Sequence, residues 1–204
     1  AKGLIRKFSE KRNGIDPGLS NGMTQIKNIL SRSNTESTNY DFKIGLHRMY
    51  NGGQFDEECL NKILRTLTAM ANQGKESTGY VIIGIADDKD DAKKFESFYK
   101  KKTLLYKDFF IAGVQEEAMR YYKTPELYRN NLESKIRNTD CIDQKYKEQI
   151  LRNIDFVKYN DRTIVILKIV NEGEAVKFDG KYYERQGTRT VEVKNEAQMW
   201  KRFF

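Results

Sequence analysis

An apolar run over residues 79–86 is the feature of this sequence that most constrains the fold. It reads Gly-Tyr-Val-Ile-Ile-Gly-Ile-Ala, and it is followed directly by Asp87 and Asp88. A short apolar run rich in β-branched residues is typical of a central strand that is buried on both faces. The chain is therefore expected to build a sheet around these residues, with the two aspartates just past the carboxyl end of the strand.

The periodicity of the remaining sequence predicts helices mainly in the first part of the chain and β-hairpins in the last part. Hairpin turns are expected at Asn160-Asp161 and Asp179-Gly180. Helices are predicted from residue 19 to about 30, from 57 to 71, from 125 to 137, from 143 to 151 and from 195 onward. Strands are predicted at 39–44, 153–159, 163–170, 176–178, 182–184 and 191–193, with a further strand within 104–111. This order predicts an α+β fold, a mixed β-sheet with flanking helices.

The charge and the length of the chain indicate its organisation and its class of partner. In 204 residues, 37 Lys and Arg oppose 29 Asp and Glu, which leaves a net charge of +8 and a pI near 9.3. We expect a basic N-terminal arm at residues 1–18, ending in an Asp16-Pro17-Gly18 turn, and one domain at residues 19–204. The excess positive charge favours a polyanionic partner such as nucleic acid.

Several classes of protein are excluded by what the sequence lacks. It has no apolar run of about 18 residues and no apolar leader, so we expect a cytoplasmic protein without a membrane partner. Cys59 and Cys141 match no disulfide or metal spacing and are expected to be core or partly exposed thiols. The Gly74-Lys75 pair lacks the residues of a phosphate-binding P-loop. His47 is the only histidine and is expected to be a surface or packing residue.

Lysines and aromatic residues are interleaved over residues 93–110. A surface that follows a phosphate backbone and stacks on bases uses this combination. A solvated loop whose aromatic residues anchor it to the core would show the same pattern, and the sequence leaves both interpretations open.

Three carboxylates could converge beside the central strand. Glu36 and Asp41 flank the start of the strand at 39–44, and Asp87 follows the central strand. If the two strands are neighbours, the repulsion between these carboxylates is relieved most simply by a divalent cation. Such an ion polarises a phosphodiester and activates water, and Lys43, on the same strand face as Asp41, offsets the developing charge. The ordinary alternative places Glu36 in a turn, Asp41 in a surface pair with Lys43, and Asp87 in a loop.

Four short blocks, in a fixed order along the sequence, resemble those of a known protein family. Glu-Ser-Thr-Asn-Tyr-Asp-Phe-Lys stands at 36–43, Thr-Ala-Met-Ala-Asn ends the helix at 68–72, and the apolar strand with its two aspartates follows at 79–88. Tyr-Tyr-Glu-Arg-Gln-Gly-Thr-Arg-Thr then occupies 182–190. Together these blocks resemble the Schlafen family, specifically its AlbA-like (AlbA_2) domain, over about residues 20–204.

The resemblance implies a function and a set of site residues. Nucleolytic Schlafen members are metal-dependent endoribonucleases that act on transfer RNA and related structured RNA. Their acidic residues fall on Glu36, Asp41 and Asp87, and the lysine of their Glu-Phe-Lys string falls on Lys43; Asp41 stands where the family usually has glutamate. Oxygen-only ligands favour Mg²⁺ or Mn²⁺ as the cofactor.

The resemblance also bears on partners. Animal Schlafens carry two such lobes and hold RNA between them, so we expect this single lobe to form a homodimer or to be one module of a larger protein. Candidate contacts to the phosphates of RNA or DNA are Arg185, Arg189, Lys100, Lys101 and Lys102. The leading hypothesis is an endoribonuclease that cleaves structured RNA. The alternatives are a non-catalytic nucleic-acid-binding module of a regulatory or defence protein, and a protein-interaction scaffold.

Overall fold

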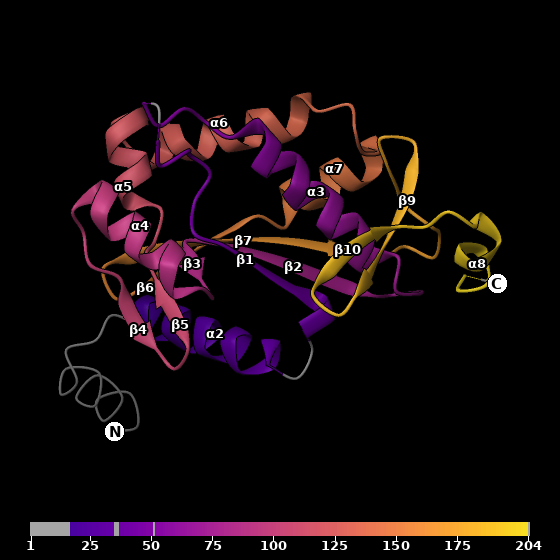
Figure 1. Ribbon diagram of the computed structural model, residues 1–204, viewed down its shortest axis with the longest axis horizontal. Helices are drawn as coiled ribbons and strands as arrows, with labels where there is room; N and C mark the ends of the chain where they lie inside the picture. Colours follow the sequence, from indigo (N-terminus) through magenta and orange to yellow (C-terminus); the bar gives the residue numbers. More distant parts are fainter. Residues whose placement is uncertain (1–16, 35–36, 51, 204) are drawn as a thin grey trace, which may run out of the picture.

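A four-stranded sheet in the order β1-β2-β7-β6 forms the centre of the fold (Figure 1). The computed structural model describes residues 17–34, 37–50 and 52–203. The sheet comprises β1 (Tyr40–Lys43), β2 (Thr78–Ile83), β6 (Asp155–Tyr159) and β7 (Arg162–Val170). β1 runs parallel to β2, whereas β2, β7 and β6 pair antiparallel. The sheet is therefore mixed, and the predicted α+β fold is confirmed.

Helices cover both faces of this sheet (Figure 1). Helix α2 (Pro17–Ser33) packs Ile26 and Leu30 on the face that carries Ile82 of β2. Helix α3 (Glu57–Ala71) lies on the opposite face, together with α6 (Pro125–Asn138) and α7 (Gln144–Arg152). The opposite face carries Val81 and Ile83, because successive side chains of a strand point to opposite sides. The predicted double burial of β2 is confirmed.

The sequence predicts one strand over the apolar run at 79–86, whereas the structure has two strands there. Gly84 separates β2 from β3 (Ile85–Ala86), which pairs with β5 (Phe109–Ile111) of a hairpin with β4 (Leu104–Tyr106). Gly84 has a φ of +102°, and a Cβ there would lie 3.0 Å from Cα of Gly113. Its N–H donates to the carbonyl of Lys43 at 2.8 Å. The chain thus bends away from the central sheet immediately beyond the end of β1.

The segment at 87–125, largely unassigned from the sequence, contains helices. Helix α4 (Lys89–Tyr99) begins after the cap Asp88 and buries Ala92 and Phe95. The lysines and aromatic residues of 93–110 are therefore divided among α4, the connection at 100–103 and the β4–β5 hairpin. The short helix α5 (Gln115–Glu117) continues into a π-helical turn, η2 (Ala118–Tyr122).

A small three-stranded sheet lies beside α3 (Figure 1). It consists of β8 (Lys177–Phe178), β9 (Lys181–Gln186) and β10 (Arg189–Glu192), and helix α8 (Glu196–Trp200) follows. The predicted hairpin turn is confirmed, with positive φ at Asp179 and Gly180. Tyr182, Met199 and Phe203 form a separate small core there.

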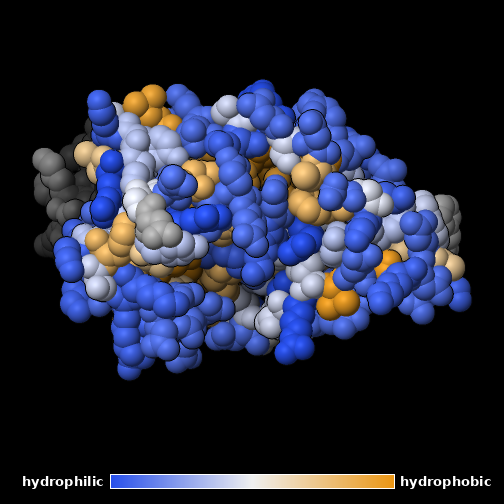
Figure 2. Space-filling model, turned by 45° about the horizontal axis from the view of Figure 1, so that its top comes forward, coloured by the Kyte–Doolittle hydropathy of each residue, from blue (hydrophilic) through white to orange (hydrophobic). Residues whose placement is uncertain are grey.

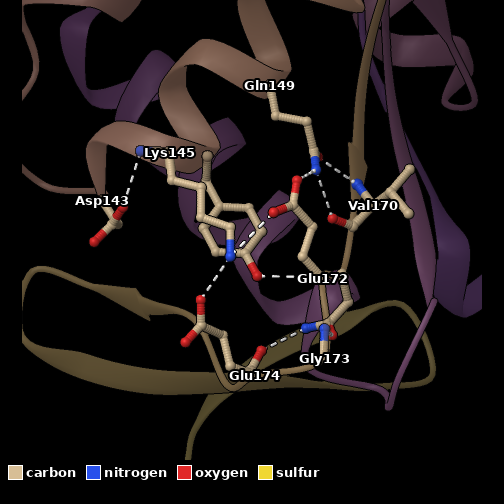
Figure 3. A network of polar contacts seen from close by, with 9 residues as sticks. Asp143, Lys145, Gln149, Val170, Glu172, Gly173 and Glu174 are labelled. Atoms are coloured by element: carbon tan, nitrogen blue, oxygen red, sulfur yellow. Dashed lines mark hydrogen bonds and ion pairs between the residues drawn. The ribbon is translucent and has the colours of Figure 1, made fainter.

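A polar network ties the loop before β8 to α7 (Figure 3). Gln149 donates to the carbonyl of Val170 at 2.9 Å and to the Glu172 carboxylate at 2.8 Å. Lys145 lies 3.0 Å from Glu172 and 2.8 Å from Glu174. These contacts hold the segment that leads into the β8–β9 hairpin against α7.

The N-terminal arm, predicted at 1–18, lies outside the described residues except for its last two. Pro17 opens α2, so this residue and Gly18 are helical, where a turn was predicted. Proline is favoured in the first turn of a helix because its missing N–H is not needed there. Within the described residues, no helix is long and apolar enough to cross a lipid bilayer.

Candidate functional site

A cavity of about 570 Å³ opens at the end of β1. Its wall is formed by the end of β1, the start of α3, the segment from the end of β3 into α4, and the tip of the β9–β10 hairpin. The residues of this wall are Asp41, Phe42, Lys43, Ile44, Gly45, Asp56, Glu58, Cys59, Lys62, Ala86, Asp87, Asp91 and Thr188. Asp41 and Asp87, far apart in the sequence, therefore share one cavity, as predicted from the order of the strands.

Asp87 and Asp88 have different tasks although they are adjacent. Asp88 caps α4, and its carboxylate accepts the N–H groups of Asp90 at 2.7 Å and Asp91 at 3.1 Å. These backbone hydrogen bonds lower the pKa of Asp88. Asp87 is exposed, and its carboxylate has no hydrogen bond or ion pair within the described part of the chain. Of the two, only Asp87 is left available for a ligand in the cavity.

Asp41 is paired with Lys43 across one face of β1. The Lys43 ammonium lies 2.5 Å from the Asp41 carboxylate and also donates to the carbonyl of Phe42 at 3.0 Å. Both side chains are mainly buried, with 20% of Asp41 and 23% of Lys43 exposed. The prediction that Asp41 and Lys43 lie on the same face of the strand is confirmed. The Lys43 ammonium therefore places a positive charge directly beside the Asp41 carboxylate.

Arg185 enters the site from the β9 strand. A second cavity of about 270 Å³ shares Asp41, Phe42, Asp87 and Thr188 with the first, and Arg185 lies in its wall. The guanidinium donates to the carbonyl of Tyr40 at 3.5 Å and to Thr190 at 3.1 Å.

Arg185 is buried, with 6% of its surface exposed. Burial lowers its pKa, and the Asp41 carboxylate opposes that shift. Its Nε atom is buried without a hydrogen-bond partner in the described residues. Arg185, predicted as a phosphate contact, is thus an internal cation next to Asp41, and any phosphate would meet it only inside the cavity.

The larger cavity is acidic. Its carboxylates, from Asp41, Asp56, Glu58, Asp87 and Asp91, outnumber its lysines, Lys43 and Lys62. Cys59, also in the wall, is no candidate for a nucleophile, because burial raises the pKa of its thiol to about 11. Both cysteines are free thiols of intermediate exposure, which is one of the two environments expected for them.

A third predicted ligand, Glu36, lies outside the described residues. Its neighbours in sequence, Asn34 and Ser37, line the smaller cavity with Asp41 and Asp87. Among the described residues, no group of three His, Cys, Asp or Glu side chains is arranged to hold a metal ion. The two carboxylates that are described offer oxygen atoms only, which is the ligand chemistry that Mg²⁺ and Mn²⁺ prefer.

The other predicted phosphate contacts lie on the surface. Arg189 begins β10 and is exposed. Lys100, which ends α4, is exposed and left-handed, with a φ of +56°. Lys101 lies 4.0 Å from Asp161, and Lys102 lies 2.8 Å from Glu96. The three consecutive lysines therefore have different surroundings, and two of them already lie beside carboxylates.

A buried cluster around Glu117 was not predicted. The Glu117 carboxylate accepts the N–H of Leu46 at 2.9 Å, the N–H of His47 at 2.9 Å and the hydroxyl of Tyr128 at 3.2 Å. His47 is buried and stacks on Tyr121, so of the two expected roles, surface or packing, it has the packing one. The cluster fixes the loop after β1, which contributes Ile44 and Gly45 to the cavity wall.

Hydrophilic residues cover most of the face shown in Figure 2, and hydrophobic residues appear there as separate patches. A large continuous apolar patch would indicate a protein or membrane partner. This face instead suits a polar or charged ligand.

Comparison with known proteins gives a family match. A family model described as Schlafen, AlbA_2 matches residues 36–194. No curated protein matches the chain. Among solved structures, the chain is similar to the crystal structure of the DIP2311 protein from Corynebacterium diphtheriae, with a TM-score of 0.48 and 19% sequence identity. The match covers 81% of this chain and 24% of that chain, so this chain spans about a quarter of that protein.

Proposed function

Because the chain belongs to the Schlafen AlbA_2 family, we propose that it binds nucleic acid and cleaves structured RNA, such as transfer RNA, at the cavity shared by Asp41 and Asp87. The observation that carries this proposal is the meeting of these two carboxylates, from separate elements, beside two internal cations. A cluster of this kind can accommodate a polyanion only when its negative charges are balanced.

The described residues can supply distinct functions in this reaction. Asp41 and Asp87, with Glu36 as the proposed third ligand, would hold Mg²⁺ or Mn²⁺. A divalent cation bound there supplies Lewis-acid polarisation of the phosphodiester. Lys43 and Arg185 place positive charge beside Asp41, where a phosphate oxygen becomes more negative as the bond to the leaving oxygen breaks.

The test compares cleavage and binding in matched variants. The wild-type protein is incubated with a transfer RNA pool and, separately, with single-stranded DNA, in Mn²⁺ or in chelator. Asp87→Asn removes one charge at the cavity, and Asp90→Asn, three residues later in the first turn of α4 and outside the cavity wall, is the control. We expect metal-dependent RNA fragments from the wild type and the control, and none from Asp87→Asn. Cleavage that persists in Asp87→Asn would contradict the proposed site.

A non-catalytic nucleic-acid-binding module is the second candidate. The close contact of Lys43 with Asp41 favours it, because a lysine ammonium occupies a position that a metal would use. In that case no variant cleaves RNA, while binding weakens steeply as salt is raised. Lys43→Met separates the two readings further, since a metal site would then bind Mn²⁺ more tightly, as measured by calorimetry.

We further propose that the lobe acts as a homodimer or within a larger protein, because one lobe offers one half of the groove that the family resemblance implies. Light scattering across a concentration series, with and without RNA, tests the dimer. A monomer that binds RNA tightly at every concentration would exclude it.

A further inference from the structure

We propose that a basic hollow lined by α4, the loop after β1 and η2 binds the phosphate backbone of the nucleic-acid strand whose cleavage is proposed above, and on that proposed function the inference rests. The hollow has a volume of about 620 Å³. Its cations are Lys93, Lys94, Lys100 and Arg120, and Phe98 lies among them. We call this surface the basic hollow.

The cavity shared by Asp41 and Asp87 has an excess of negative charge. In that cavity carboxylates outnumber lysines, so without bound metal it repels a phosphate backbone. Neutralising backbone phosphates with Lys and Arg is the main source of non-specific affinity for nucleic acid. Affinity must therefore come from another surface, and among the described residues no carboxylate lies in the wall of the basic hollow.

The cations of the hollow are available to a ligand. Arg120 and Lys100 have no carboxylate partner within the described residues. Lys93 and Lys94 form exposed pairs with Asp90 at 3.1 Å and with Asp91 at 2.8 Å. Exposed pairs of this type contribute little and exchange readily for another anion.

Aromatic contacts favour nucleic acid over other polyanions. The Arg120 guanidinium lies 4.4 Å from the centre of the Phe98 ring and 5.7 Å from that of Tyr99. The stacking holds the planar guanidinium in one orientation, and Arg binds phosphate with two parallel N–H groups. The half-buried ring of Phe98 also offers a surface for an unstacked base.

The hollow and the cavity share two segments, α4 and the loop after β1. Helix α4 contributes Asp91 to the cavity, and Lys93, Lys94 and Phe98 to the hollow. The loop after β1 contributes Gly45 to the cavity and Met49 to the hollow. The two surfaces are therefore neighbours along α4, where Asp91 of the cavity pairs with Lys94 of the hollow at 2.8 Å.

The experiment measures binding of a short fluorescein-labelled oligouridylate by anisotropy, in chelator, between about 50 and 200 mM salt. The test variant is Lys100→Asn with Arg120→Ala, because asparagine tolerates the left-handed conformation of Lys100. The control is Lys107→Asn with Arg129→Ala. Lys107 is also left-handed, with a φ of +53°, and the exposed Arg129 lies over the ring of Phe156 at 4.0 Å. Both variants lose the same charge.

For single strands each lost phosphate contact lowers the slope of log K against log salt by about 0.7, so two contacts lower it by about 1.4, equivalent to about 25-fold weaker binding at 0.1 M salt. We expect this in the test variant and a change of less than about 3-fold in the control. Equal slopes in wild type and test variant would overturn the basic hollow and leave the proposed function standing. No binding by the wild type would overturn both.

Discussion

Removal of the Glu117 carboxylate should destabilise the loop after β1, which lines the proposed site. Glu117 is 2% exposed, and its two oxygens accept hydrogen bonds from two backbone N–H groups, of Leu46 and His47, and from the Tyr128 hydroxyl. All three donors belong to buried residues. Glu117→Ala leaves these three donors without an acceptor, because the methyl side chain of alanine has no oxygen atom.

The cost follows from the number of orphaned donors. Each buried donor left unsatisfied costs about 1 to 3 kcal/mol, so the loss of one acceptor for three donors should lower the free energy of unfolding by about 3 to 9 kcal/mol, with the lower value if water enters. Glu117→Gln keeps an amide oxygen that can still accept both backbone N–H groups. Because neutral hydrogen bonds are weaker than those to a charged group, its cost should be about 1 to 2 kcal/mol.

The assay is urea unfolding followed by circular dichroism, with Glu116→Ala as the control from the same turn. Glu116 is half-buried in the same helix, so its variant should change the free energy of unfolding by less than about 0.5 kcal/mol. A loss below about 1.5 kcal/mol for Glu117→Ala would refute the reasoning, because it would mean that the loop N–H groups have other acceptors.

Three further predictions test the fold and its ionisable groups. Gly84→Ala should destabilise more than Gly173→Ala, because both residues have φ near +100° but only at Gly84 would a Cβ meet backbone, at 3.0 Å from Gly113; thermal unfolding of the two variants measures the difference. Lys102 and Thr103 lower the pKa of Glu96 from 4.5 to about 2, so this contribution to stability is complete above pH 4.5 and is lost as pH falls toward 2. Glu96→Gln should flatten the pH dependence of urea unfolding in that range, and an unchanged pH profile would count against the interaction. Cys59, with a pKa of about 11, should be about 0.1% thiolate at pH 8, against about 10% for the ordinary value of 9.0, so iodoacetamide should modify it far more slowly in the native protein than in urea.

Local patterns in the sequence were enough to predict most elements. The helix at 57–71 and the Asp179-Gly180 turn are determined by neighbouring residues, and each is found where it was expected. The alternation in β1 correctly placed Asp41 and Lys43 on one face. The order of the first two strands was also sufficient to bring Asp41 and Asp87 to one cavity.

Features that depend on contacts between distant segments could not be predicted in this way. The bend at Gly84 requires the close approach of Gly113, which lies 29 residues later in the sequence. The burial of Arg185 depends on the packing of β9 against the edge of β1, and the role of Glu117 depends on a π-helical turn that leaves no periodic signal. In each case the residue itself can be read from the sequence, but the residues that it contacts in the fold cannot.

The separation of charge around α4 has a consequence for how the domain would work. Since acidic residues surround the cavity and cations surround the basic hollow, changes in the hollow should alter affinity and its salt dependence without changing the arrangement of Asp41 and Asp87. The Asp91–Lys94 pair is the one described ion pair that joins a wall residue of the cavity to a wall residue of the hollow. A phosphate that takes Lys94 frees the carboxylate of Asp91 beside the cavity, and this increases the negative charge there and with it the affinity for a divalent cation. Nucleic acid and metal should therefore bind with positive coupling, and Lys94→Met should reduce that coupling.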